Sequence, residues 1–295
     1  MSAFVRRSKA LLAGLALVLG LSAPAGAEPP RRVVSINLCT DQLALLIAAP
    51  GQLVSVSNLG QDAMLSAMAD RAAAFPANRG QAEEVFLMRP DLVLAGTFTT
   101  QATVDLLQRL GVPVAQFPPV SSLDDLRDGI VRMGAALGRE AVADEIVARF
   151  DADLAALSAT APVGTARPRA ALYYPNGYSL GDRTLAGQVL AAAGLANVAA
   201  EAGLHHGGHL ALEQLVLADP DLILTGRRYP TPARAQDVLD HPALTAGSGA
   251  ARRGNIDDRD LICGTPQVLK ALADLVARRQ ALAAPAPAPE VEAGG

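Results

Sequence analysis

The chain has 295 residues, of which 51% are hydrophobic and 18% are charged, and its formal net charge at pH 7 is −4. This length is sufficient for two domains with hydrophobic cores. The acidic balance argues against nucleic acid or an anionic membrane surface as the partner of the protein.

The first 27 residues have the pattern of a secretory signal peptide. Three basic residues precede the uninterrupted apolar run 11–21, and Ala25-Gly26-Ala27 supplies small side chains for cleavage. The run is well short of the ~20 residues that span a bilayer, and position 28 is Glu rather than the Cys of a lipoprotein. We therefore expect cleavage after Ala27 and a soluble periplasmic protein with 22 basic and 29 acidic side chains, a net charge of −7.

Short apolar runs alternate with helical patterns in the first part of the mature chain, which indicates a parallel sheet. We expect Thr40 or Asp41 to cap the first helix. The predicted strands are 32–36, 53–56, 92–95 and 112–117, and the predicted helices are 42–48 and 101–110.

A long helical pattern follows from residue 123 to about residue 157, with a break or bend near Gly138. Its second part, 139–157, has one apolar stripe and contains neither Gly nor Pro. About 19 residues at ~1.5 Å each give a rod of roughly 28 Å. Such a rod can join two lobes stiffly.

The remaining sequence predicts a second α/β lobe after the Pro-containing linker 162–168. The predicted elements are strands 170–174 and 222–225, a short edge strand near 260–263, helix 184–193, and a last helix from Thr265 or Pro266 to about 282. The resulting division is 28–138 for the first lobe, 139–160 for the linking helix, 161–282 for the second lobe and 283–295 for a Pro/Ala-rich tail that we expect to be disordered.

One sequence pattern occurs twice in the chain. Residues 83–96 read EEVFLMRPDLVLAG, and residues 213–226 read EQLVLADPDLILTG. In each copy a glutamate begins a helical apolar stretch, and Pro-Asp then introduces a β-type run that ends at Gly. Such a repeat indicates two lobes of similar structure, and clefts between lobes bind small molecules. Recurrence of an ordinary helix–turn–strand unit is the alternative.

Together these features resemble the periplasmic binding proteins of iron–siderophore and vitamin B12 ABC importers. The resemblance rests on the export signal, the opening RVVSINLCTDQLALL, the paired Glu…Pro-Asp-Leu units, the central helix and the stretch TLAGQVLAAAGLANVA, and it covers residues 31–282. It implies two Rossmann-like α/β lobes with parallel sheets, joined by one long rigid helix. It also implies a monomer without a cofactor of its own, which captures a metal chelate between the lobes and delivers it to an ABC permease dimer in the inner membrane.

In that family a glutamate on each lobe pairs with arginines of the permease, and the matching residues here are Glu83 and Glu213. Two exposed carboxylates would steer and orient the docking partner. The alternative is that a Glu near a helix start only interacts favourably with the helix dipole.

Ligand contacts are expected where parallel strands end at the cleft. All four tyrosines lie in the second lobe near such ends and suit stacking on a flat ligand, Arg can bind carboxylates or phosphates, and Phe98 could form an apolar wall. Ordinary core or surface roles are the alternative for each tyrosine and for the pair Arg227-Arg228. The candidates are Asn37, Cys39, Thr40, Phe98, Tyr174, Tyr178, Arg227, Tyr229 and Cys263.

The cysteines and histidines leave further alternatives. Cys39 and Cys263 are the only cysteines; in an oxidising compartment they could form a disulfide that clamps the lobes, or remain two thiols, one of them touching the ligand metal. His205, His206 and His209 form the one histidine cluster. Gly residues inside it disfavour a shared helix face, and the first lobe has no His to complete a site, so we predict no protein metal site but a polar loop near the cleft.

The sequence predicts a carrier rather than an enzyme. It lacks the Gly-rich nucleotide loops, and a triad of Ser179, Asp182 and His205 has no support in its spacing. The predicted cargo is a ferric siderophore or a corrinoid. Haem ranks third because no Tyr or His is a convincing iron ligand. An exported hydrolase, a free metal-ion or haem-binding protein, and a sensor or adaptor with the same fold are the alternatives.

Overall fold

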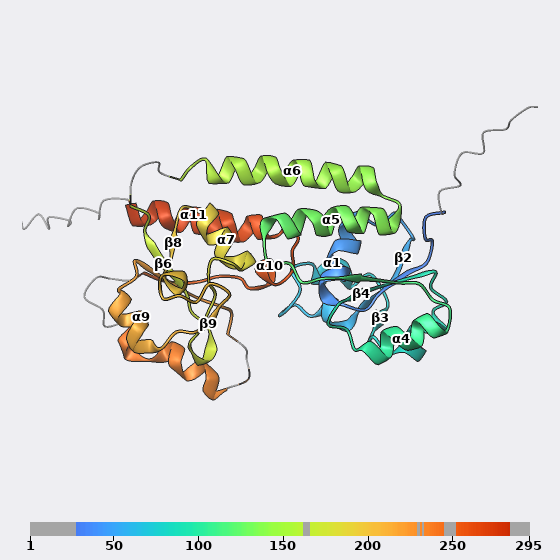
Figure 1. Cartoon of the computed structure of the whole chain (residues 1–295), viewed down its shortest axis with the longest axis horizontal. Coiled ribbons are helices and arrows are strands. Elements are labelled where there is room, and N and C mark those ends of the chain that lie inside the picture. Colours follow the sequence, from blue (N-terminus) through green and yellow to red (C-terminus); the bar gives the residue numbers. More distant parts are fainter. Residues whose placement is uncertain (1–27, 162–165, 229–230, 232, 245–251, 284–295) are drawn as a thin grey trace, which may run out of the picture.

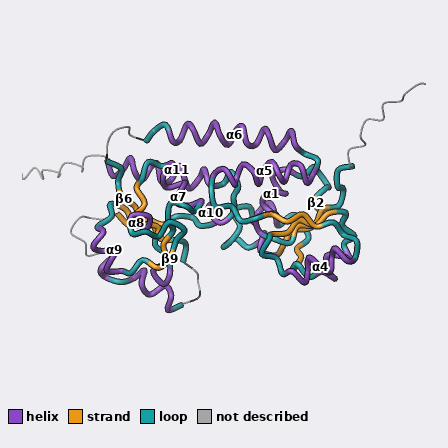
Figure 2. Tube along the Cα trace, viewed as in Figure 1, coloured by secondary structure: helices purple, strands orange, loops and turns teal. Residues whose placement is uncertain are grey.

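The computed structural model describes residues 28–161, 166–228, 231, 233–244 and 252–283. These residues form two α/β lobes that lie side by side, with helix α6 (Glu140–Ser158) extending over both (Figure 1). The strands gather in two separate groups, one in each lobe (Figure 2). The expected signal peptide and residues 284–295 of the expected tail lie outside the described residues.

The first lobe is built on a five-stranded parallel sheet of order β3-β2-β1-β4-β5. The four predicted strands are present, and the two-residue strand β3 at the edge was not predicted. The strands are β1 (Val33–Ser35), β2 (Leu53–Ser57), β3 (Ala77–Asn78), β4 (Leu92–Gly96) and β5 (Val114–Phe117). The helices are α1 (Leu38–Ile47), α2 (Ala69–Ala72), α3 (Ala82–Leu87) and α4 (Gln101–Arg109).

Helix α1 begins four residues earlier than predicted. Asn37, not Thr40 or Asp41, is its N-cap: the side-chain Oδ1 of Asn37 accepts hydrogen bonds from the backbone N–H groups of Cys39 and Thr40. The prediction of a cap at Thr40 or Asp41 is wrong because both residues lie inside the first helical turns, with their side chains buried. Asn is as good an N-cap as Asp or Ser, so the signal was in the sequence.

The long helical pattern 123–157 folds as two helices, α5 (Leu123–Leu137) and α6. Ser122 caps α5, and Gly138 ends it in the left-handed conformation with φ of 64°. The chain then turns back, so that α6 packs along α5 and also against α11 (Val268–Ala283) of the second lobe. A Cβ at Gly134 would lie 2.5 Å from the Cβ of Ala143, so glycine at this position permits the close packing of α5 and α6.

The second lobe contains a four-stranded parallel sheet of order β11-β10-β6-β8 and an antiparallel pair, β7-β9. The strands are β6 (Arg169–Leu172), β7 (Tyr178–Ser179), β8 (Ala196–Asn197), β9 (Gly208–His209), β10 (Leu222–Thr225) and β11 (Arg252–Asn255). The helices are α7 (Leu185–Ala192), α8 (Val198–Glu201), α9 (Leu212–Ala218), α10 (Arg259–Ile262) and α11, with 3-10 segments at Pro175–Gly177, Arg234–Asp240 and Pro242–Leu244.

The predicted edge strand near 260–263 is wrong, because this segment is the short helix α10 and the edge strand is β11. The carboxylate of Asp257 accepts hydrogen bonds from the backbone N–H and from the guanidinium of Arg259. This local ring favours a helical turn, whereas the apolar pair Leu261-Ile262 alone suggests a strand.

The largest hydrophobic cluster is continuous between the lobes. It includes Val33 and Leu94 of the first sheet, Phe150 of α6, and Leu172 and Leu224 of the second sheet, all of them buried. The lobes therefore share packed side chains beneath α6 rather than being joined by a bare linker. Among the described residues, no helix is long and apolar enough to cross a membrane.

Candidate functional site

A cavity of about 360 Å³ lies where strands β1, β4 and β5 end and the second lobe begins. This volume is within the range of small-molecule sites. Both lobes contribute to its wall, the second lobe through Ile262 and Gly264. The first lobe contributes Asn37, Cys39, Thr40, Leu43, the segments 96–98 and 117–120, and Asp125, Asp128, Gly129 and Arg132 of α5.

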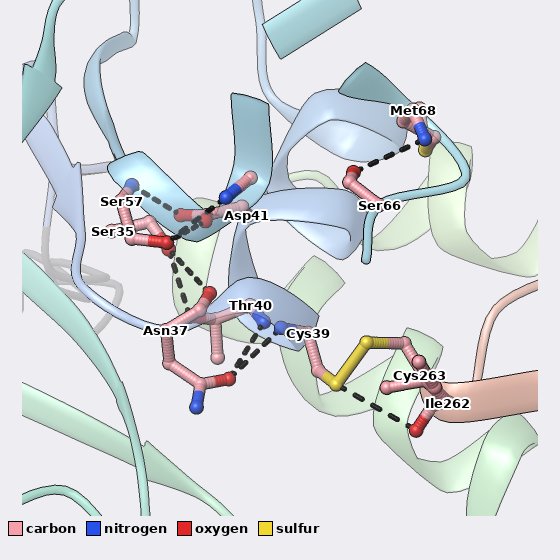
Figure 3. The surroundings of a disulfide bond; sticks show 11 residues. Ser35, Asn37, Cys39, Thr40, Asp41, Ser57, Ser66, Met68, Ile262 and Cys263 are labelled. Carbon is pink, nitrogen blue, oxygen red and sulfur yellow. Dashed lines mark hydrogen bonds between the residues drawn. A yellow bond between two sulfur atoms is a disulfide. The ribbon is translucent and has the colours of Figure 1, made fainter. Parts of the chain in front are cut away.

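A disulfide between the lobes borders this cavity (Figure 3). Cys39 lies in the first turn of α1 and Cys263 directly follows α10; their sulfur atoms are 2.10 Å apart and their Cα atoms 5.0 Å apart. Of the two alternatives that the sequence leaves open, the structure has the disulfide. The Cys39 sulfur also lies 3.9 Å from the carbonyl of Ile262, which is a contact only, since a disulfide sulfur carries no proton.

Asn37 and Thr40 use their polar groups within the first lobe. The Thr40 hydroxyl donates to the backbone carbonyl of Asn37 at 3.0 Å and lies 2.8 Å from the hydroxyl of Ser35. A Cβ on Gly96 would lie 2.9 Å from the amide nitrogen of Asn37, so the last residue of the repeat must be small for Asn37 to keep its place. The Asn37 Oδ1 and the Thr40 hydroxyl are therefore engaged within the first lobe, where they shape the cavity wall.

Asp41, which the sequence suggested only as a cap, is a buried carboxyl group beneath the site. Its Oδ1 accepts a hydrogen bond from the backbone N–H of Ser57 at 3.0 Å, and its Oδ2 accepts one from the Ser57 hydroxyl. Burial raises the pKa of Asp41 to about 7, although hydrogen bonds from Ser35 and Ser57 act in the opposite direction. These bonds hold the end of β2 against α1.

Two arginines of the second lobe reach the first lobe on the other side of β1. Arg227 and Arg259 approach the carbonyl of Ala63 with nitrogen–oxygen distances of 3.4 and 2.9 Å. Both also face Asp257, at 3.8 and 2.5 Å, and the pKa of Asp257 is lowered chiefly by its hydrogen bonds to Arg259. Arg227 was predicted at the cleft, whereas Arg259, which directly precedes the predicted edge strand 260–263, was not.

Neither Tyr174 nor Tyr178 lines the cavity. Tyr174 packs against the main hydrophobic cluster, and burial raises the pKa of its hydroxyl. Tyr178 is half exposed on β7, directly opposite His209 on β9. Tyr229 lies outside the described residues. Arg228 forms a two-pronged ion pair with Asp240 at 2.8 and 2.6 Å on the surface, in keeping with the surface role left open for it.

The geometry gives no support to a hydrolase. Ser179 is completely buried and its hydroxyl donates to the carbonyl of Leu172 at 2.6 Å. His205 is half exposed and pairs through Nδ1 with Asp182 Oδ1 at 2.8 Å, and this bond is the main cause that lowers the pKa of Asp182. Within the described residues, no three His, Cys, Asp or Glu side chains gather closely enough to hold a metal ion.

The two glutamates of the repeat, Glu83 and Glu213, are both exposed, each in the first turn of its helix, α3 or α9. The neighbouring Glu84 differs, because its carboxylate accepts a hydrogen bond from the backbone N–H of Arg79 at 2.8 Å.

Comparison with known proteins places these features in a family. Residues 33–258, well over half of the chain, match the family described as periplasmic binding protein. A cobalamin-binding protein of Halobacterium salinarum is 29% identical over 199 residues, which are 67% of this chain and 54% of that protein. The chain thus spans about half the length of the curated relatives that it matches.

Solved structures show the same fold at low identity. The periplasmic heme-binding protein RhuT from Roseiflexus sp. RS-1 is 24% identical, with a TM-score of 0.71 over 86% of this chain and 99% of that chain. The periplasmic vitamin B12 binding protein BtuF of Vibrio cholerae is 18% identical, with a TM-score of 0.65 over 86% and 98%. The resemblance predicted from the sequence is confirmed, and the chain belongs to the periplasmic binding protein family.

Proposed function

We propose that this protein is a periplasmic solute-binding protein that captures a metal chelate between its lobes and delivers it to an ABC permease of the inner membrane. The observation that carries this proposal is a cavity walled by both lobes, beside a disulfide that holds them together, in a chain of the periplasmic binding protein family. Export through a cleavable signal peptide and a monomeric state belong to the same proposal.

The lining of the cavity favours a cargo whose metal needs no ligand from the protein. Among the described residues, the cavity wall contains no Tyr, His or Met, and Cys39 is in the disulfide, so this part of the wall offers none of the side chains that usually ligate haem iron. A ferric siderophore or a corrinoid carries its own ligands and needs only shape, apolar contact and a few polar partners. The similarity to a cobalamin-binding protein supports the corrinoid. Haem remains the third candidate.

Phe98 is the residue with which to test the cargo site. Its side chain is 88% exposed at the cavity, next to the end of β4, and a ligand that covers it would remove most of this apolar area from water. We expect Phe98→Ala to weaken binding of the cognate chelate by roughly tenfold. Isothermal titration with cyanocobalamin, a ferric hydroxamate and haemin measures this effect.

Leu110→Ala is a matched control, since Leu110 is an exposed apolar residue that does not line the cavity; it should leave the Kd unchanged. Wild-type protein that binds neither cyanocobalamin nor any ferric siderophore would contradict the proposed cargo. An unchanged Kd for Phe98→Ala, with wild-type binding intact, would contradict only the role of Phe98.

Docking to the permease is proposed to use Glu83 and Glu213, one on each lobe. Changing both to Gln should slow association with the permease several-fold and weaken its dependence on ionic strength, because exposed carboxylates act chiefly by steering. Chelate binding should not change. Glu145→Gln, which removes an exposed carboxylate from α6, is the control. An association rate that is equal for wild type and the double variant at low salt would refute this assignment.

A further inference from the structure

The two copies of the repeat have the same backbone shape at the turn between helix and strand. Each turn contains a non-glycine residue with a positive φ, which is 51° at Arg89 and 44° at Asp219. Such a conformation is uncommon for residues other than Gly, Asn and Asp. It occurs at the same position of the repeat in both lobes.

The same hydrogen bonds hold the turn in each lobe. The carboxylate of Asp91 accepts from the backbone N–H of Arg32 at 2.9 Å, and that of Asp221 accepts from the backbone N–H of Arg169 at 2.7 Å. The side chain of Arg32 also donates to the backbone carbonyl of Met88 at the end of α3. The side chain of Arg169 donates in the same way to the carbonyl of Ala218 at the end of α9. The last turn of each helix is thereby fixed on its lobe.

Each of these fixed helix ends presents a pair of apolar side chains to water. Leu87 is 79% exposed and Leu217 is 84% exposed, and the residues before them, Phe86 and Val216, are 41% and 42% exposed. The residue before each pair is completely buried, so the two helices have the same sequence of inward and outward positions. None of the four side chains lines the cavity between the lobes.

The exposed pairs lie beside the glutamates of the repeat. Leu87 follows Glu83 by four residues, and Leu217 follows Glu213 by four, so each leucine lies one helical turn from its glutamate on the same face. In Figure 1, α9 and α4, against which α3 packs, lie on the side of the lobes away from α6. Each lobe therefore presents one carboxylate and one apolar anchor in the same order.

We propose that Leu87 and Leu217, flanked by Phe86 and Val216, are the apolar anchors of permease docking and determine how long the complex lasts. The inference rests on the proposed function. The partner that fits is a membrane protein with two equivalent apolar pockets, each bordered by a basic side chain that meets Glu83 or Glu213. Buried apolar anchors supply most of the affinity of an interface and act on dissociation, whereas peripheral charges act on association.

A lipid surface fits these residues less well than a protein does. Each leucine has a carboxylate one turn away, and an anionic membrane surface repels carboxylates. The mature sequence is also acidic overall, with 29 Asp and Glu against 22 Lys and Arg after residue 27. The equivalence of the two lobes calls for a partner with the same feature twice, which a bilayer does not provide.

The test compares Leu87→Ser, Leu217→Ser and the double variant for binding to the cognate permease–ATPase complex in lipid nanodiscs, by biolayer interferometry at two salt concentrations. Each single change should speed dissociation about tenfold, and the double change should weaken binding by about a hundredfold or more. The salt dependence of association should stay that of the wild type. Val131→Ser, at an exposed position on α5, is the matched control and should bind normally.

The outcomes separate this inference from the function on which it rests. Wild-type protein that does not bind the permease would contradict the proposed function itself. Wild-type binding with unchanged dissociation in the double variant, while chelate binding is retained, would overturn the role of the leucines alone. Binding of wild type, but not of the double variant, to empty nanodiscs would also overturn it, by making lipid the partner.

Discussion

Replacing Cys39 and Cys263 together by alanine is expected to lower the free energy of unfolding by roughly 5 kcal/mol. The two cysteines are 224 residues apart in the sequence, and on the chain-entropy account a disulfide that closes so long a loop restricts the unfolded chain strongly. Alanine is preferred to serine because Cys263 is buried and a buried hydroxyl would add its own cost. Denaturant unfolding of the wild type with its disulfide intact and of the double variant measures the difference.

Reduction supplies the control for this experiment. A reducing agent should destabilise the wild type by a similar amount and leave the double alanine variant unaffected. Mass spectrometry after alkylation of the native protein should find no free thiol. Two alkylated cysteines in unreduced protein would contradict the disulfide and, with it, the covalent connection of the lobes at the cavity.

Changing Asp41 to Asn is expected to remove a pH dependence of stability between about pH 4 and pH 7. The pKa of Asp41 is raised from 3.8 to about 7 in the fold, first of all by burial. Between these two values the folded state holds a proton that the unfolded state has lost, so the free energy of unfolding falls as pH rises through this window. The loss is on the order of 4 kcal/mol and is complete about one pH unit above the folded-state pKa.

Unfolding free energies at pH 4, 5.5 and 8 for wild type and Asp41→Asn test this expectation. The amide oxygen can still accept from the Ser57 backbone N–H, so the fold should be retained. As pH rises, the free energy of unfolding should fall for the wild type but not for the variant. Asp153→Asn, at an exposed position on α6, corrects for the loss of one negative charge. Parallel pH profiles for wild type and Asp41→Asn would show that the buried carboxyl group has an ordinary pKa.

The architecture was predictable because its signals are local and repeated. Apolar runs bounded by Pro-Asp and Gly mark β4 and β10, and Ser122 marks the start of α5 in the sequence and in the structure. At Gly138 the sequence predicts a break or a bend without deciding between them, because a glycine shows that a helix can stop but not in which direction the next one continues. That direction is set by the packing of α6 on α5 and α11.

The site was predicted only in part because it depends on contacts between distant segments. Asn37, Cys39, Thr40 and Phe98, which the sequence places at strand ends facing the cleft, line one cavity. The expectation that ligand contacts lie at the carboxyl ends of strands could not show that Tyr174 packs against the hydrophobic core. It also could not show that Arg259 contacts the first lobe. It also could not identify Asp41 as buried, since an acidic residue in the first turn of a helix is usually an exposed, favourable one.

The cross-link between Cys39 and Cys263 has a topological consequence for the whole chain. Because the bond joins a residue near the start of the first lobe to one just before the last helix, the intervening backbone forms a covalent ring that contains β2 to β11 and the helices between them. A single cut by a protease anywhere in this ring leaves both fragments attached to each other. In a compartment rich in proteases, nicked molecules would therefore stay in one piece as long as the bond remains oxidised.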